Sequence, residues 1–277
     1  MKNAISWLLA LMITFSIVIF QFIMSKTHPL STEVNTGKQH LHFDLLRSYS
    51  GKTDCPMILK VEDITVSGYI LYRNYPTADS MIRINLHREG DNLIAYLPNQ
   101  LPSKKLEYRI FLERAGNVIL VNSGKPIIIK FLGVVPFYIL LFHTIFIFLS
   151  VLFSNSTGIF AVVGNKSYKW MIYLTILALM SVVFLLQPLT HKYALGQSLT
   201  GFPFSFELSD NKILITLVIW LVTMFFNLRK AQPRLVVLAA FTSMIVLSIP
   251  HGFPGSEPNP INMKIIQRNF LSLLQLF

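Results

Sequence analysis

Three histidines and two carboxylates of this chain are placed where a metal ion or a haem could be bound. They are His143, His191, Glu207, Asp210 and His251. Imidazole and carboxylate ligands together suit zinc, iron or copper, and a pair of imidazoles can ligate haem iron. The sequence contains no ligand spacing such as H-x-x-x-H, so this chemistry depends on the fold bringing the side chains together. A metal- or haem-containing redox component is therefore one functional hypothesis.

His143 is the most deeply placed of these residues. It lies roughly ten residues into the apolar segment 132–153, which at about 1.5 Å per residue is near the middle of a bilayer. An ionisable side chain at that depth indicates a functional site. A neutral imidazole that hydrogen-bonds to a neighbouring helix also explains the residue, and both alternatives stay open.

Long apolar segments must position these side chains. Of the 277 residues, 53% are hydrophobic and 13% are charged, whereas a soluble domain carries roughly a quarter charged residues. This composition and the apolar runs predict an integral membrane protein with about five helical spans. The runs cover residues 4–24, 132–153, 170–189, 213–228 and 235–250. Because the last two have only about 16 residues each, we expect Lys212 and Arg234 to extend them by snorkelling.

Between the first two apolar runs, the sequence changes to short segments rich in β-branched and aromatic residues. Several of them alternate apolar with polar residues, as half-buried strands do. The turns REGDN and ERAGN separate such segments, because Gly, Asn and Asp tolerate positive φ. We expect a small immunoglobulin-like or fibronectin-like sandwich, whereas the polar stretch 27–54 is expected to be irregular, with at most one edge strand. The expected strand segments are 66–76, 81–98, 105–121 and 125–133.

These features predict four regions along the chain. Residues 1–26 are expected to be an uncleaved signal anchor, because the apolar run of about 21 residues can cross a bilayer and no small-residue cleavage pattern follows it. Residues 27–131 are expected to form an extracytoplasmic β domain, and 132–250 a block of four transmembrane helices. Residues 251–277 are expected to be an extracytoplasmic tail, whose apolar residues recur at the spacing of an interfacial amphipathic helix.

Basic residues in the short loops predict the orientation in the membrane. Cytoplasmic loops carry an excess of Lys and Arg, whereas long domains are translocated largely regardless of charge. The N-terminus is therefore expected in the cytoplasm, and the β domain and C-terminus outside. The basic residues that fall on the cytoplasmic side are Lys2, Lys166, Lys169, Arg229, Lys230 and Arg234.

Two loops rich in Gly, Pro and Phe are expected on the outer side. In SLTGFPF, Gly201 and Pro203 fix the chain, and in GFPGSEPNP, Gly252 and Pro254 do the same. Together they could form a lid over the outer ends of the helices. In the ELSDNK segment that follows the first loop, Ser209 or Asp210 is placed to cap the next helix.

Several function classes are excluded by the sequence. Cys55 is the only cysteine, so neither an intrachain disulfide nor a cysteine-based metal site can form. The net charge of +11 is dispersed, without a basic run or a nucleic-acid-binding motif, so a nucleic-acid partner is not expected. The chain also lacks a nucleotide-binding loop, a serine-nucleophile elbow, and the HExxH and CxxC motifs. Few buried charges and no inverted repeat argue against a transporter.

Four stretches carry a family resemblance: residues 45–80, 87–113, 192–212 and 249–257. They resemble a group of bacterial membrane proteins with one N-terminal span, an extracytoplasmic β domain and a block of C-terminal spans. In that group the loop reads aromatic-T-G-aromatic-P-F-G and then D-L-T-D-N-K. This chain departs from the pattern at Leu199 and Ser205. The resemblance implies a location in the bacterial inner membrane, but it brings no established activity, ligand or functional residue.

The second functional hypothesis is therefore a membrane protein without enzymatic activity. Its β domain would bind a protein partner, while the spans hold it in the lipid bilayer, because sandwiches of this size commonly serve recognition. No cofactor is expected under this hypothesis. The redox alternative instead requires haem or a transition metal at the outer histidines.

Overall fold

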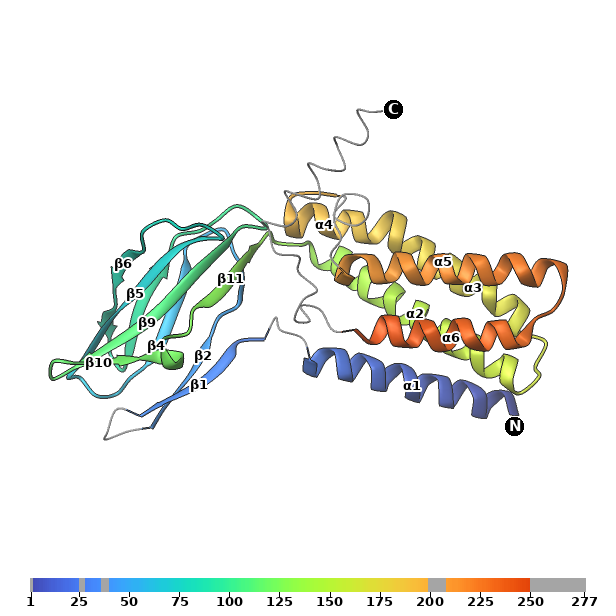
Figure 1. Cartoon of the computed structure of the whole chain (residues 1–277), viewed down its shortest axis with the longest axis horizontal. Coiled ribbons are helices and arrows are strands. Elements are labelled where there is room, and N and C mark those ends of the chain that lie inside the picture. Colours follow the sequence, from blue (N-terminus) through green and yellow to red (C-terminus); the bar gives the residue numbers. More distant parts are fainter. Residues whose placement is uncertain (1, 25–27, 36–39, 199–207, 250–277) are drawn as a thin grey trace, which may run out of the picture. The chain divides into compact units, whose positions relative to one another are not determined.

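The computed structural model describes residues 2–24, 28–35, 40–198 and 208–249. The chain divides into two compact units (Figure 1). A helical unit contains residues 1–25, 135–193 and 197–277. A β unit contains residues 26–134 and 194–196.

The β unit contains three sheets within the described residues. The largest has the strand order β3-β11-β9-β5-β6, with β10 paired to β9, and the second has the order β4-β8-β7. Strands β1 and β2 form a hairpin of their own, and the only parallel pair among the described strands is β3 with β11. The strands are β1 Leu30–Asn35, β2 His40–Leu45, β3 Ser48–Ser50, β4 Cys55–Lys60, β5 Val66–Tyr75, β6 Ile82–Asn85, β7 His87–Glu89, β8 Asn92–Leu97, β9 Lys105–Arg114, β10 Asn117–Leu120 and β11 Ile127–Leu132.

All three sheets contribute side chains to one hydrophobic core. In strand β9 every second residue faces the core, and these inward residues, Leu106, Tyr108, Ile110 and Leu112, are almost completely buried. They share the core with buried residues of β4, β8 and the β1–β2 hairpin. The predicted strand segments and both turns are confirmed, since REGDN joins the paired strands β7 and β8 and ERAGN joins β9 and β10. Gly116, at φ +80°, supplies the positive φ that the second turn needs.

The expectation for residues 27–54 was wrong. This stretch contains β1, β2 and β3. In β2, Leu41, Phe43 and Leu45 are buried in the core, while the alternate residues are exposed. Polar composition hid these strands, because only every second side chain of β2 has to be apolar for the strand to contribute to the core.

Cys55 lies at the start of β4 and is buried. Burial raises the pKa of its thiol from 9.0 to about 12, because the charged thiolate is poorly solvated there. Between these two values the folded state holds more protons than the unfolded state, so the free energy of unfolding must fall as pH rises through this window. We expect a Cys55→Ala variant to lose stability less steeply than the wild type when unfolding is measured from about pH 8 to about pH 10. Equal slopes for the two proteins would contradict this assignment.

Among its described residues, the helical unit contains four helical stretches long and apolar enough to cross a membrane: 3–24, 137–162, 168–195 and 211–229. The third consists of α3, a π-helical turn η2 and α4, and α6 is a shorter apolar helix. Helix α2 continues well past the predicted end at residue 153. The elements are α1 Lys2–Met24, α2 Phe137–Val162, α3 Tyr168–Ser181, η2 Val182–Leu186, α4 Gln187–Leu195, α5 Leu208–Arg229 and α6 Pro233–Ser248.

The second half of α2 is polar and yet buried. Five consecutive residues, 154–158, are buried, and α2 contacts α1, α3 and α6. Small side chains on several sides of one helix let its neighbours approach closely. A Cβ added to Gly158 would lie only 2.5 Å from the Cβ of Ala240 in α6. Helix α2 is therefore packed by small residues at this level.

Helix α1 is joined to the rest of the helical unit by side-chain hydrogen bonds at three levels. Near its start, Asn165 donates to the side chain of Asn3, and in its middle Asn155 donates to Thr14 Oγ1 at 3.0 Å. Near its end, Gln21 donates to the backbone carbonyl of Leu247 in α6. One face of this helix carries small buried residues, two of them polar: Ser6, Ala10 and Thr14.

The C-terminal end of α6 is stabilised by side chains of two other helices. Besides the bond from Gln21, Lys212 of α5 donates from Nζ to the carbonyl of Ile249 at 3.1 Å. Lys212 is only 3% exposed, so its side chain is directed into the helical unit. The expectation that it snorkels toward the membrane surface was wrong. A cation at a helix C-terminus complements the helix dipole and satisfies a carbonyl that would otherwise have no intrahelical partner.

Candidate functional site

Two of the three predicted histidines lie in described helices of the helical unit. His143 is in α2, and His191 is in α4. His143 Nε2 is buried and has no hydrogen-bond partner among the described residues. His143 is therefore the predicted histidine whose buried polar atom is left unsatisfied among the described residues.

The side chains of the other predicted site residues lie outside the described part of the chain. Asp210 lies in the first turn of α5, and its side chain is outside the described residues, as is that of Ser209. The residues that lie entirely outside the described part of the chain are Gly201, Pro203, Glu207, His251, Gly252 and Pro254, together with the tail that follows. Within the described ranges, no group of three His, Cys, Asp or Glu residues could hold a metal ion.

A second candidate site is the face of the six-stranded sheet that points away from the β core, here called the outer face. Strand pairing places its residues in rows that cross the sheet. One row consists of Leu120, Phe111, Tyr69 and Asn85, and the next of Arg109, Leu71 and Arg83. A third contains Ile128, Glu107 and Arg73, and a fourth contains Val118, Glu113 and Ser67.

The centre of the outer face is an ion-pair network around Glu107. Arg73 donates to one carboxylate oxygen of Glu107 from Nε at 3.1 Å and from Nη2 at 2.9 Å. Arg109 approaches the other oxygen at 3.5 Å. The Glu107 side chain is only 7% exposed, while those of Arg73 and Arg109 are 28% and 37% exposed. A buried carboxylate held by two guanidinium groups fixes the positions of both arginines.

An aromatic stack lies beside this network. The rings of Tyr69 and Phe111 are parallel within 7°, with centroids 4.9 Å apart. The guanidinium of Arg83 lies 3.8 Å from the centre of the Tyr69 ring, which is a cation–π geometry. Arg83 also approaches Glu113 at 3.9 Å. The side chains of the outer face are therefore ordered by one another, before any partner binds.

The outer face is rich in arginine and aromatic side chains. Aromatic residues and arginine are enriched at the centres of protein interfaces and supply most hot spots. Exposed apolar residues extend this surface, since Val118, Leu120 and Ile128 are 51%, 48% and 39% exposed. Three arginines and the two lysines Lys105 and Lys130, set against two glutamates, give it a formal charge of +3. Such a face suits an acidic protein surface.

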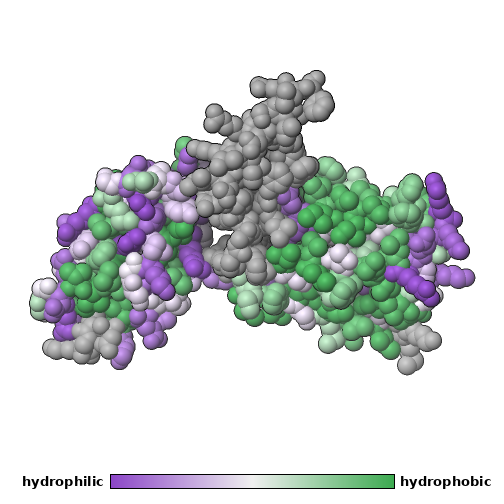
Figure 2. Space-filling view, in the orientation of Figure 1, coloured by the Kyte–Doolittle hydropathy of each residue, from purple (hydrophilic) through white to green (hydrophobic). Residues whose placement is uncertain are grey.

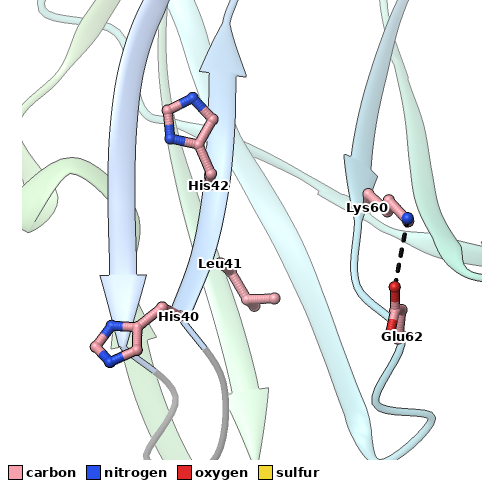
Figure 3. Close-up of a pocket in the computed structure, with 5 residues that line it drawn as sticks. All are labelled: His40, Leu41, His42, Lys60 and Glu62. Atoms are coloured by element: carbon pink, nitrogen blue, oxygen red, sulfur yellow. Dashed lines mark ion pairs between the residues drawn. The ribbon is translucent and has the colours of Figure 1, made fainter.

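A polar hollow of about 360 Å³ lies elsewhere on the β unit (Figure 3). His40 and His42 of β2 line it together with Lys60 and Glu62, which form an ion pair at 3.3 Å. His42 is also 3.7 Å from Asp44. The charged groups of this hollow are exposed, and no Phe, Tyr or Trp of the described residues lines it, in contrast to the outer face.

Comparison with known proteins finds no matching family model, no similar curated protein and no similar solved structure. The family resemblance of the four stretches therefore stays an expectation.

Proposed function

We propose that the chain is an integral membrane protein of the bacterial inner membrane whose β unit faces outward and binds a protein partner. The proposal of membrane placement is supported by the four long apolar helical stretches. Figure 2 shows apolar side chains over most of the visible face of the helices. The connections after α2 and α5 contain Lys166 and Lys230, and the adjoining helix ends carry Lys169 and Arg229. This excess of basic residues favours a cytoplasmic side for both connections. The β unit follows α1 and precedes α2, so it belongs on the opposite side.

Cysteine labelling tests this orientation. The only native cysteine, Cys55, is buried and gives little background. We expect Ser80→Cys, in the exposed β5–β6 connection, to react with a membrane-impermeant maleimide on intact spheroplasts. Ser167→Cys, exposed between α2 and α3, should react only after lysis. If only Ser167→Cys reacted on intact spheroplasts, the proposed orientation would be wrong, and the β unit would lie on the cytoplasmic side.

An immunoglobulin-like arrangement of the β unit is part of the proposal. The strand orders β3-β11-β9-β5-β6 and β4-β8-β7, with one shared core, support it. Sandwiches of this type divide their strands between two sheets in a comparable way. Fold alone does not decide function, so the binding proposal depends on the outer face itself.

The single observation that carries the binding function is the ordered stack of Arg83, Tyr69 and Phe111 beside the Glu107 network. Side chains that are already fixed lose little conformational freedom on binding, and affinity gains accordingly. The partner is expected to be an acidic protein surface, because the outer face carries excess positive charge. The chain then acts as a non-enzymatic scaffold or binding component.

Purification of the full chain in mild detergent tests this function. We expect a protein to co-purify with the wild type in a fixed ratio and to be lost from Arg83→Glu by roughly tenfold or more, since like charges across an interface are strongly unfavourable. Lys60→Glu is the matched control, because it makes the same charge reversal on the other sheet at a residue that is 70% exposed. Equal loss from both variants, or from neither, would contradict the proposal.

A redox or metal-binding role is the second candidate, and the buried His143 Nε2 without a hydrogen-bond partner among the described residues is the observation that favours it. It predicts that the purified protein is coloured or contains stoichiometric metal. We expect a His143→Ala/His191→Ala variant to lose that absorption or metal content. A colourless and metal-free wild type, measured by absorption spectroscopy and elemental analysis, would remove this candidate.

A further inference from the structure

A hollow of about 140 Å³ lies between α3 and α5, where the start of α3 meets the end of α5. Helix α3 contributes Lys169, Ile172 and Tyr173, which lie on one face because they are three and four residues apart. Helix α5 contributes Met224, Asn227 and Leu228 at the same spacing. The hollow therefore has a cation, a phenol and an amide beside three apolar side chains.

The mouth of the hollow is strongly basic. Segments 163–170 and 227–235, which connect α2 to α3 and α5 to α6, contain no Asp or Glu. Figure 2 shows hydrophilic residues gathered at this end of the helices, next to the apolar surface. Within the described part of the chain, none of the basic residues here forms an ion pair: Lys166, Lys169, Arg229, Lys230 and Arg234. The local positive charge thus remains available to an anion.

The polar groups of the hollow differ in what they can offer a ligand. Asn227 donates to the Thr223 carbonyl and accepts from the backbone of Gln232, so its amide is already used. Tyr173 is 45% exposed, and its ring lies 6.1 Å from that of Trp170, which is 67% exposed. Exposed Trp and Tyr together mark the headgroup level of a membrane. Lys169 and Tyr173 are therefore the groups that can meet an anionic headgroup.

We propose that this hollow binds an anionic glycerophospholipid, with the phosphate at Lys169 and Tyr173 and an acyl chain along Met224 and Leu228. Basic pockets between membrane helices on the cytoplasmic side commonly bind such headgroups. The apolar wall favours a lipid over a free phosphate ion, because a free ion would leave Met224 and Leu228 uncovered. The inference depends on the membrane placement of the helical unit proposed above.

Native mass spectrometry of the delipidated full chain tests the proposal. Phosphatidylglycerol and phosphatidylcholine with identical acyl chains are added at equal concentration, and the retained lipids are counted. We expect a preference for phosphatidylglycerol of roughly fivefold in the wild type, as one lysine near an anionic headgroup provides. Lys169→Gln should lose this preference. Lys166→Gln, which removes the same charge from the same connection outside the hollow, should keep it.

Three outcomes would overturn the lipid site: equal retention of both lipids, equal effects of Lys169→Gln and Lys166→Gln, or displacement of the lipid by an equal concentration of inorganic phosphate. Alkaline extraction of the same membranes separates this failure from failure of membrane placement. If the chain stays with the extracted membrane but shows no lipid preference, only the lipid site is wrong. If alkali releases the chain, the membrane placement is wrong as well.

Discussion

Replacing Gly158 by alanine is expected to destabilise the helical unit by about 1–3 kcal/mol, the usual cost of overpacking a well-packed site. The added Cβ would lie 2.5 Å from the Cβ of Ala240, far inside van der Waals contact. Neither atom belongs to a flexible side chain, so α2 and α6 have to move apart. Thermal unfolding of the detergent-solubilised full chain should show a lower melting temperature.

A second-site change provides the control for this prediction. Ala240→Gly removes the methyl group that the new Cβ meets, although glycine within a helix itself costs roughly 0.5–1 kcal/mol. We expect Gly158→Ala/Ala240→Gly to be more stable than Gly158→Ala alone and less stable than the wild type. If Ala240→Gly fails to improve Gly158→Ala, the close approach of the two helices is not the cause.

Arg73→Met is expected to destabilise the β unit by about 3 kcal/mol, because it leaves the buried carboxylate of Glu107 without its closest partner. The remaining contact, from Arg109, is longer at 3.5 Å. Hydrogen–deuterium exchange of β5 and β9, measured in the full chain, should become correspondingly faster. The melting transition of the β unit should also shift to lower temperature.

Two variants make this second prediction specific. Lys60→Met removes an ion pair with Glu62 whose side chains are 70% and 60% exposed, so its effect should stay within about 0.5 kcal/mol. Arg73→Met/Glu107→Leu removes both buried charges and should be more stable than Arg73→Met alone. Equal destabilisation by Arg73→Met and Lys60→Met would show that Glu107 is not the cause of the effect.

The strands of the large sheet could be predicted because they alternate or are flanked by turns. In β9, apolar residues face the core at every second position, and the ERAGN turn marks its end. Strand β2 carries the same alternation in the sequence HLHFDL, but the polar stretch around it favoured an irregular chain. Strand β4 was missed because apolar and polar residues do not alternate in its sequence CPMILK, although the structure buries every second side chain.

The end of α2 could not be predicted from hydropathy. The residues Ser154, Asn155 and Thr157 lower the apolar signal at the point where the helix continues. Local hydrogen bonds make this possible, since Thr157 donates to the carbonyl of Phe153 and Asn155 donates to Thr14 of α1. These partners come from tertiary packing, which a hydropathy profile does not contain.

The candidate binding face was also beyond prediction from the sequence. Alternation in β5 and β9 indicates which of their side chains leave the core, but not that the two strands are neighbours. Arg73 and Glu107 are 34 residues apart, and only the pairing of β5 with β9 brings them together. The predicted histidines were chosen by residue type and by inferred depth in the membrane, and the structure places His143 and His191 in the same helical unit.

The most direct test of the central claim is site-specific photo-crosslinking in intact cells. A photoreactive amino acid is placed at Leu71 on the outer face, and in a separate variant at Ile58, which is 58% exposed on the three-stranded sheet. We predict one adduct of defined mass from position 71, abolished by Arg83→Glu, and none from position 58. Adducts of equal yield from both positions, or no adduct from position 71, would contradict a partner-binding role for the outer face.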